Sequence, residues 1–419
     1  MYDTRPNRHP FPPSACPAVR LFGTFPPVKL AHLADLHLGF RQYHRQTPSG
    51  INQREVDVAN AFRAAVDDVI TARPDAVLIA GDLFHSVRPT NTAILFAFNQ
   101  LHRLREALPE APIVLIAGNH DTPRSAETGS ILQLFESVGV DVVAEGARRL
   151  VYPNLDLSIL AVSHEALISP DRPELRAQGP ESHQVLLLHG EVAGVFPSDR
   201  TIVEYGGAPL EAGELVGGGW SYVALGHYHV QHQVAPGVWY SGAVDYVSPN
   251  PWGELKDERE HGLDGKGWLL VELPGPVVTP RPVEPARGLL DLEPLEGDGL
   301  SAVELDQAIA TRLAAIPGGP TDKVVRLVVR DVPRHVGRDI DHGAIRGYQA
   351  EALHFQLDLR RPEDHRAVGV GAPGRRQTLP EIVAAYLAAR PLPSDVDREV
   401  FVRTGTALLD AVERDAAGA

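Results

Sequence analysis

The sequence is poor in cysteine and contains no long apolar run. Its single cysteine, Cys16, excludes an internal disulfide framework and is typical of a reducing compartment, so we expect a cytoplasmic protein. No run approaches the roughly 18 apolar residues that a membrane-spanning helix needs, so no membrane segment is expected. Residues 1–27 are rich in proline and arginine but lack the apolar core of a signal peptide, and we interpret them as a disordered extension.

An excess of positive charge is also missing. The net charge of −15 argues against a generally basic surface that coats nucleic acid. It does not exclude a polyanionic substrate, because bound divalent cations can invert the charge of a local site. The length of 419 residues and the hydrophobic content of 43% indicate two or three globular domains with a sizeable core.

Short apolar stretches, each typical of a buried strand, end in side chains that can ligate a metal ion. Aspartate and asparagine offer an oxygen, and histidine offers a ring nitrogen. A single strand end of this kind is weak support for a metal site, whereas five of them together indicate a metal site. The five ends are Asp35-Leu36-His37 after residues 29–34, Gly81-Asp82 with His85 after 76–80, Gly118-Asn119-His120-Asp121 after 113–117, His189-Gly190 after 184–188, and Gly226-His227-Tyr228-His229 after 222–225.

The order of elements predicts where these ends meet. The first three strands alternate with helical patterns at residues 56–71 and 90–108, which implies parallel neighbours joined by right-handed crossovers. All three carboxyl ends then lie on one edge of the sheet, where open α/β sheets bind ligands. Asp35 and His37 share a face of an extended chain and can point at one ion. Taken alone, this pair is better explained as a capping aspartate and an unrelated histidine.

The donor set indicates two divalent ions. Seven ligands are too many for a structural zinc site, which takes four and usually includes cysteine. They suit two ions about 3.5–4 Å apart that clamp the attacking and leaving oxygens of a displacement at phosphorus. Donors without thiolate favour Mn²⁺, Fe²⁺ or Zn²⁺ over Mg²⁺ or Ca²⁺. The seven are Asp35, His37, Asp82, Asn119, His189, His227 and His229, with Asp82, on the central strand, as the expected bridge.

Patterning divides the chain into further parts. A strand at 267–272 is expected to close the first domain, residues 28–275. Residues 276–362 alternate short strands with helical stretches, and we interpret them as a smaller α/β accessory domain. Residues 363–378 have the composition of a linker. Residues 379–419 are predicted to form a helical hairpin, which is either a docking element or a strap on its own domain.

The motifs and their order resemble those of the calcineurin-like metallophosphoesterase superfamily. Within it, the chain is similar to the Mre11/SbcD nuclease subunits of DNA double-strand-break repair. The narrower similarity is carried by Ala34-Asp35-Leu36-His37-Leu38-Gly39 and by Gly81-Asp82-Leu83-Phe84-His85-Ser86 followed by Arg88-Pro89. It implies an α/β (α+β) fold in which a two-sheet β-sandwich is flanked by helices, with a DNA-capping domain and ATPase-docking helices.

The resemblance also assigns the ligands and the reaction. The implied activity is Mn²⁺-dependent hydrolysis of DNA phosphodiesters, by 3′–5′ exonuclease and single-strand endonuclease action. One ion would be held by Asp35, His37, Asp82 and His229, and the other by Asp82, Asn119, His189 and His227.

Catalytic residues and partners follow from the same resemblance. His120 would stabilise the transition state and protonate the leaving oxygen, held by Asp121, and His85 would handle the DNA phosphate. An SbcC/Rad50-type ATPase is the implied partner. A homodimer is implied through residues 90–108 and 131–138, although an apolar helical stripe is more often simply core.

The path of the DNA and the substrate class stay open at this point. A small-molecule phosphodiesterase or phosphatase of the same superfamily is one alternative, although it needs no second domain. An architectural DNA-end tether is another, although a scaffold needs no ligand set. A solvated surface is the better explanation for each possible phosphate contact taken singly; these are Arg88, Arg124, Arg334, His335, Arg338, Arg360, Arg361, Arg375 and Arg376.

Overall fold

A computed structural model describes residues 27–123, 129–195, 206–263, 265–362, 379–390, 392 and 397–417. The predictions made for the extension with Cys16, for the linker at 363–378, and for Arg124, Arg375 and Arg376 fall outside these described residues. Within the described part of the chain, no helix is long and apolar enough to cross a membrane.

The first sheet is built around short strands that are almost completely buried, which explains their continuous apolar sequence. β1 (Val28–Leu33) pairs in parallel with β2 (Ala76–Ile79), and β2 pairs in parallel with β3 (Ile113–Ile116). The predicted parallel order with β2 in the centre is therefore confirmed. The same sheet also contains antiparallel β13 (Gly267–Leu273) and β14 (Val277–Pro282) beside β1, and β4 (Asp141–Val143) beside β3.

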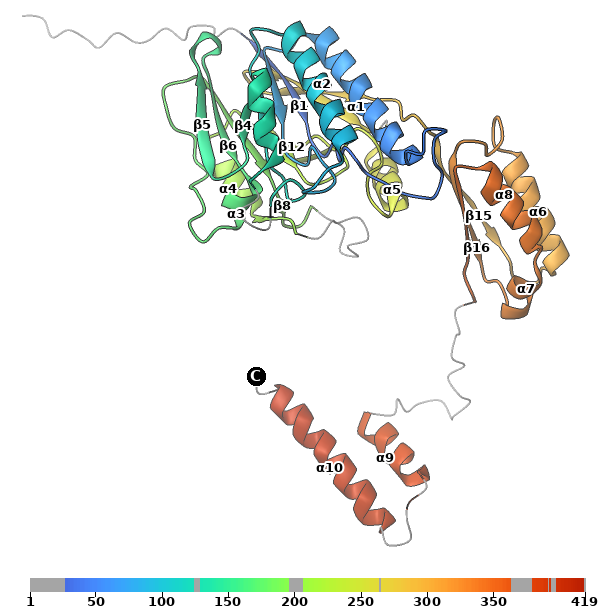
Figure 1. Cartoon of the computed structure of the whole chain (residues 1–419). Coiled ribbons are helices and arrows are strands. Elements are labelled where there is room, and N and C mark those ends of the chain that lie inside the picture. The colour runs from blue at the N-terminus through green and yellow to red at the C-terminus, as the bar shows by residue number, and fades with distance from the viewer. Residues whose placement is uncertain are drawn as a thin grey trace, which may run out of the picture.

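Two long helices cover the outer face of this sheet (Figure 1). They are α1 (Gln53–Ala72) and α2 (Asn91–Ala107). The side chains of Asn52 and Thr90 cap them by accepting backbone N–H groups of the first turn. Both helices bury apolar side chains such as Phe62 against the sheet, each worth about 1.5–3 kcal/mol.

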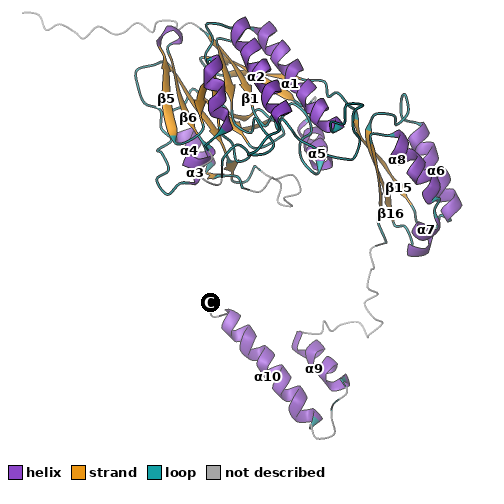
Figure 2. Cartoon of the chain, viewed as in Figure 1, coloured by secondary structure: helices purple, strands orange, loops and turns teal. Residues whose placement is uncertain are grey.

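A second sheet packs face to face with the first (Figure 2). Leu78 and Ile116 of the first sheet share one apolar cluster with Leu187 and Ala224 of the second. This is the two-sheet sandwich that the sequence predicted. The strands of the second sheet, in spatial order, are β11 (His232–Ala235), β12 (Val238–Tyr240), β10 (Tyr222–Gly226), β7 (His183–His189), β6 (Leu157–Val162) and β5 (Ala147–Tyr152).

Smaller elements cover the remaining faces of the sandwich. The 3₁₀-helix η2 (Ile131–Val138) packs beside α2, and a third apolar cluster lies on the outer face of the second sheet. The other short elements are η3 (Pro153–Leu155), α3 (His164–Ile168), β8 (Glu191–Val192), β9 (Pro209–Leu210), α4 (Ala212–Gly217) and α5 (Pro251–His261).

The accessory domain is a three-stranded parallel sheet with helices and its own apolar core. A capping box of Ser301 and Glu304 begins its first helix, and the Asp341 side chain caps its third. Its strands are β15 (Leu289–Glu296), β16 (Val324–Arg330) and β17 (His354–Leu359), and its helices are α6 (Ala302–Ala314), α7 (Arg334–Asp339) and α8 (His342–Glu351).

The boundary between the two domains differs from the expected residue 275. β14 pairs along its whole length with β13, so the first domain continues to Pro282. The turn at residues 274–276 has the proline and glycine of a domain boundary, but here it joins two strands of one hairpin. Its composition could not distinguish a hairpin turn from a domain boundary.

Direct contacts join the two domains near α5. The indole of Trp252 packs with Val324 and Leu353, and its Nε1–H donates to Gln356 Oε1 at 2.8 Å. Arg45 donates from Nη2 to two carbonyl oxygens of the accessory domain at 2.8 Å. The predicted C-terminal helices are present as α9 (Leu379–Ala389) and α10 (Arg398–Ala417), which pack against each other.

Candidate metal centre

The loops that follow β1 and β2 are hydrogen-bonded to each other. The backbone N–H groups of Asp35 and His37 donate to the carbonyls of Gly81 and Asp82 at 3.1 and 2.9 Å. Asp35, His37 and Asp82 have φ values of 53°, 43° and 53°. The extended geometry expected for Asp35 and His37 is therefore wrong: left-handed turns bring their side chains together. Such strained backbone concentrates at functional sites because surrounding structure must hold it.

The first group of donors surrounds His37. Its Nε2 lies 3.2 Å from His229 Nε2, and Asp35 completes a buried cluster of ligand atoms that lie within 4.8 Å of one another. The carboxylate of Asp35 also accepts the backbone N–H of His227 at 3.0 and 3.1 Å. This contact ties the end of β1 in the first sheet to the end of β10 in the second.

The second group of donors surrounds Asn119. Its Oδ1 lies 2.9 Å from His189 Nε2 and 3.2 Å from His227 Nδ1. His189 is oriented from behind, because its Nδ1 hydrogen-bonds the carbonyl of Ala80 at 2.8 Å. That bond leaves His189 Nε2 as the nitrogen available to a metal ion.

Asp82 lies between the two groups. Its Oδ2 is 3.3 Å from His189 Nε2 and 3.7 Å from His37 Nε2. Burial opposes ionisation of this carboxyl, but the imidazoles of His189 and His37 hold its pKa well below the usual value. Its other oxygen, Oδ1, accepts the backbone N–H of His120 at 2.9 Å. This is the geometry expected of a bridging carboxylate.

Two glycines permit the close approach of these loops. A Cβ at Gly118 would lie 2.1 Å from Asp82 Oδ1, and a Cβ at Gly226 would lie 2.0 Å from the carbonyl oxygen of Ala80. Any larger residue would push the loops apart at the point where the ligands converge.

The donor set fits two divalent cations. Ligands about 2.1 Å from a shared cation lie about 3 Å from each other, as the paired atoms of both groups do. Buried Asp82 Oδ2 accepts no hydrogen bond from any described residue, which is a costly arrangement unless a cation is bound there. The seven side chains predicted from the sequence therefore converge as two overlapping groups.

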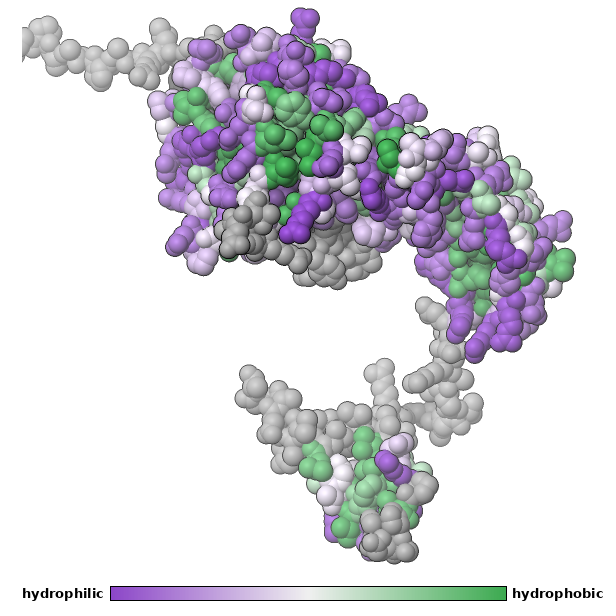
Figure 3. Space-filling view, viewed as in Figure 1, coloured by the Kyte–Doolittle hydropathy of each residue, from purple (hydrophilic) through white to green (hydrophobic). Residues whose placement is uncertain are grey.

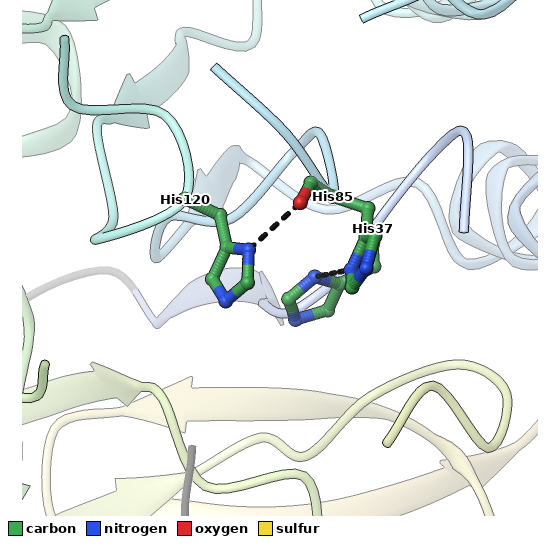
Figure 4. Close-up of side chains that lie close together, drawn as sticks. All are labelled: His37, His85 and His120. Carbon is green, nitrogen blue, oxygen red and sulfur yellow. Dashed lines mark hydrogen bonds between the residues drawn. The ribbon is translucent and has the colours of Figure 1, made fainter. Parts of the chain in front are cut away.

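Two further histidines lie beside the first group (Figure 4). His85 Nδ1 is 3.3 Å from His37 Nδ1, and the rings of His85 and His120 stack with centroids 5.2 Å apart. His120 Nδ1 donates to the carbonyl oxygen of His85 at 2.8 Å. The sequence predicted both histidines in the site, and the structure places both there.

Asp121 has a different environment from the one expected. It was predicted to hold His120, but its carboxylate accepts the backbone N–H groups of Leu83, Phe84 and Gly118 at 3.1–3.2 Å. Burial and the neighbouring Asp82 raise the pKa of Asp121 to about 7. Asp121 therefore joins the two loops, while the carbonyl of His85 orients His120.

Sequence reasoning missed a buried ionic group that lies behind His229. Glu254 Oε1 lies 3.1 Å from His229 Nδ1, and Lys266 forms an ion pair with Glu254. Glu254 follows no strand and belongs to no motif, so only the folded position of α5 identifies it.

The arginines proposed as DNA contacts are dispersed. Arg334, Arg338 and Arg361 line one open cavity of about 330 Å³ on the accessory domain. Arg360 instead forms an ion pair with Asp358 at 3.0 Å. Arg88 lies on the loop between β2 and α2, close in sequence to His85.

Comparison with known protein families identifies the class of protein to which the site belongs. Residues 28–231, which include all seven ligands, match the calcineurin-like phosphoesterase family. The chain therefore contains a calcineurin-like metallophosphoesterase domain, in agreement with the sandwich and its metal-type ligands.

The more specific similarity is to Mre11 proteins. The chain is 29% identical over 263 residues to the DNA double-strand break repair protein Mre11 of Methanococcus maripaludis, covering 59% of this chain and 64% of that one. It is 28% identical over 256 residues to Mre11 of Methanocaldococcus jannaschii (59% and 63%) and 30% identical over 254 residues to that of Sulfolobus acidocaldarius (59% and 61%).

The match thus spans less than two thirds of these relatives. A solved dimetal phosphatase from Danio rerio aligns with 62% of this chain and 97% of its own, at a TM-score of 0.36 and 12% identity.

Proposed function

We propose that this protein is the nuclease subunit of a DNA double-strand-break repair complex and hydrolyses DNA phosphodiesters with two Mn²⁺ ions. The observation that carries the proposal is the convergence of seven ligands, six of them buried, with His85 and His120 beside them, in a chain similar to Mre11 proteins. The proposed action is that of a 3′–5′ exonuclease and single-strand endonuclease.

The ligands and the metal chemistry follow from the two donor groups. Asp35, His37 and His229 would hold one ion, Asn119, His189 and His227 the other, and Asp82 both. When bound, the two ions supply the positive charge that stabilises the developing charge on a phosphodiester undergoing in-line displacement.

His120 is proposed to be the general acid. Its Nδ1–H donates to the carbonyl of His85, so the proton that the doubly protonated ring can transfer lies on Nε2. His85 Nδ1 lies 3.3 Å from His37 Nδ1, and the residue is only half-buried. We assign it to contact the scissile DNA phosphate.

The accessory domain is proposed to bind the DNA backbone. Arg334, Arg338 and Arg361 share one cavity and are exposed, so they can offer several positive charges to neighbouring phosphates. Arg360 is the weaker candidate, because Asp358 already neutralises it.

Two apolar surfaces support the proposed partners. Leu95 of α2 and Leu134 of η2 are 63% and 40% exposed, and apolar side chains gather in the region of α2 in Figure 3, which suits a homodimer contact. On the terminal helices, Tyr386 and Leu408 are 65% and 64% exposed, which suits docking of an SbcC/Rad50-type ATPase better than a strap on its own domain.

The proposal is tested with purified full-length protein, Mn²⁺ and end-labelled linear duplex DNA, in parallel with a chromogenic phosphodiester. We expect progressive shortening of the DNA that stops with chelator and in His120→Ala. Turnover of the small ester beside intact DNA, with a candidate ATPase also present, would establish a small-molecule phosphodiesterase and overturn the proposal. DNA binding without turnover of either substrate would establish a tether.

A further inference from the structure

The buried ionic group behind His229 is built from two segments of the chain. Glu254 comes from the first turns of α5, and Lys266 immediately precedes β13. Glu254 is completely buried and Lys266 is only 2% exposed. A buried lysine is stable only when its charge is paired and its N–H groups are hydrogen-bonded. The buried ionic group therefore depends on specific partners, unlike an ion pair on the surface.

Lys266 fixes the carboxylate of Glu254 in place. Its Nζ forms ion pairs with Glu254 Oε2 and, at 2.8 Å, with Glu258 Oε1, and it donates to the carbonyl oxygen of His229 at 2.7 Å. Tyr246 OH donates to the other oxygen of Glu258 at 2.7 Å. The remaining oxygen of Glu254, Oε1, faces His229 Nδ1 at 3.1 Å. One lysine therefore holds both the backbone of a ligand and the carboxylate behind its ring.

The two donor groups differ in the group that hydrogen-bonds the Nδ1 atom of a ligand histidine. His189 is backed by the neutral carbonyl of Ala80, whereas His229 is backed by the charged carboxylate of Glu254. A carboxylate that accepts Nδ1–H fixes the tautomer and makes Nε2 a stronger ligand than a carbonyl does.

We propose that Glu254 is a positioning residue for His229 and selectively strengthens the metal site that contains Asp35, His37 and His229. The inference rests on the proposed dinuclear centre but not on DNA as the substrate. Glu254 acts through His229 and is not itself one of the seven ligands.

The test measures Mn²⁺ binding to the metal-stripped full chain by calorimetry. We expect wild type to bind two ions and Glu254→Gln to weaken one of them by about 10–100-fold, with the second unchanged. Glu254→Asp should recover part of the affinity, since it keeps the charge. In a His229→Ala background, Glu254→Gln should cause no further loss, because the residue through which Glu254 acts is absent.

Glu258→Gln is the matched control. It lies on the same helix and contacts the same lysine, but it pairs with Lys266 and Tyr246, neither of which is a metal ligand. Equal weakening of metal binding by Glu254→Gln and Glu258→Gln would mean a merely structural role and would overturn the proposal, as would unchanged binding in Glu254→Gln. A wild type that binds two ions without cutting DNA would instead overturn only the proposed function.

Discussion

At the scale of single residues, the orientation of His120 separates proton transfer from metal binding. Its ring is directed by the carbonyl of His85, and its backbone N–H supports Asp82. The side chain is therefore dispensable for the ligands, while its backbone is not. Replacing the side chain should remove chemistry and leave the centre assembled.

We predict that His120→Ala binds both Mn²⁺ ions and DNA like wild type but hydrolyses DNA 10²–10⁴-fold more slowly, the usual contribution of a general acid. Metal content by mass spectrometry, DNA binding and a nuclease assay on the same preparation check this. Loss of metal from the variant, or retained cleavage, contradicts the assignment.

The burial of His32 leads to a prediction about the pH dependence of stability. It is buried between the sheets, where its Nδ1 lies 2.9 Å from Tyr222 OH, and burial lowers its pKa to about 3, partly offset by a bond with the backbone of Leu225. The unfolded chain binds a proton near pH 6.5 and the folded protein does not. The stabilisation is therefore complete above pH 6.5 and is lost as the pH falls toward 3.

We expect the free energy of unfolding of wild type to fall between pH 7 and pH 5 by about 2 kcal/mol more than that of His32→Gln. Glutamine can still bond Tyr222 but does not titrate. Denaturant melts in the presence of chelator measure the difference without a contribution from metal. Parallel curves for the two proteins would show that His32 is protonated in the fold.

At the scale of elements, the carboxyl ends of strands carry the site. Three parallel strand ends in the first sheet meet two in the second, and the loops approach so closely that glycine is required. Because Gly118 packs tightly against Asp82, the addition of a single methyl group at Gly118 tests this packing.

We predict that Gly118→Ala lowers the free energy of unfolding by about 1–3 kcal/mol and displaces Asp82, so that Mn²⁺ affinity falls. The control is Gly213→Ala in α4, where an added Cβ meets open space and the helix gains up to about 1 kcal/mol. Thermal melts and metal titrations of both variants provide the comparison. Unimpaired metal binding in Gly118→Ala would show that the loops are not closely packed there.

Strand ends were also what the sequence could predict best. Apolar runs that stop at Asp82, Asn119 or His189 are local signals, and parallel topology brings them together without further information. The left-handed turns at Asp35 and His37 were missed because sequence periodicity assumes a regular backbone. The contacts of Asp121 and Glu254 depend on which distant group packs beside them, and no spacing rule encodes that.

At the scale of the whole molecule, the metal centre joins the two sheets. Asp35, Asp82 and Asn119 belong to the first sheet, and His189 and His229 belong to the second. Bound ions would therefore stabilise the sandwich, because the unfolded chain cannot hold these donors together.

We expect Mn²⁺ at about 100 times its dissociation constant to raise the unfolding free energy by about 2.7 kcal/mol per site and Tm by about 5 °C or more. Asp82→Asn should lose most of the shift, because this carboxylate serves both donor groups. Scanning calorimetry with Mn²⁺ and with chelator checks the effect. The same shift in wild type and variant would contradict a shared bridge.

The distribution of ligands over both sheets also has a use in protein engineering. A gene divided between β6 and β7 would yield one polypeptide with Asp35, His37, Asp82 and Asn119 and a second with His189, His227 and His229. Neither half contains a complete set of donors for either ion. A biosensor could use the two halves, because a reporter phosphodiester would stay intact until an analyte brings the halves together.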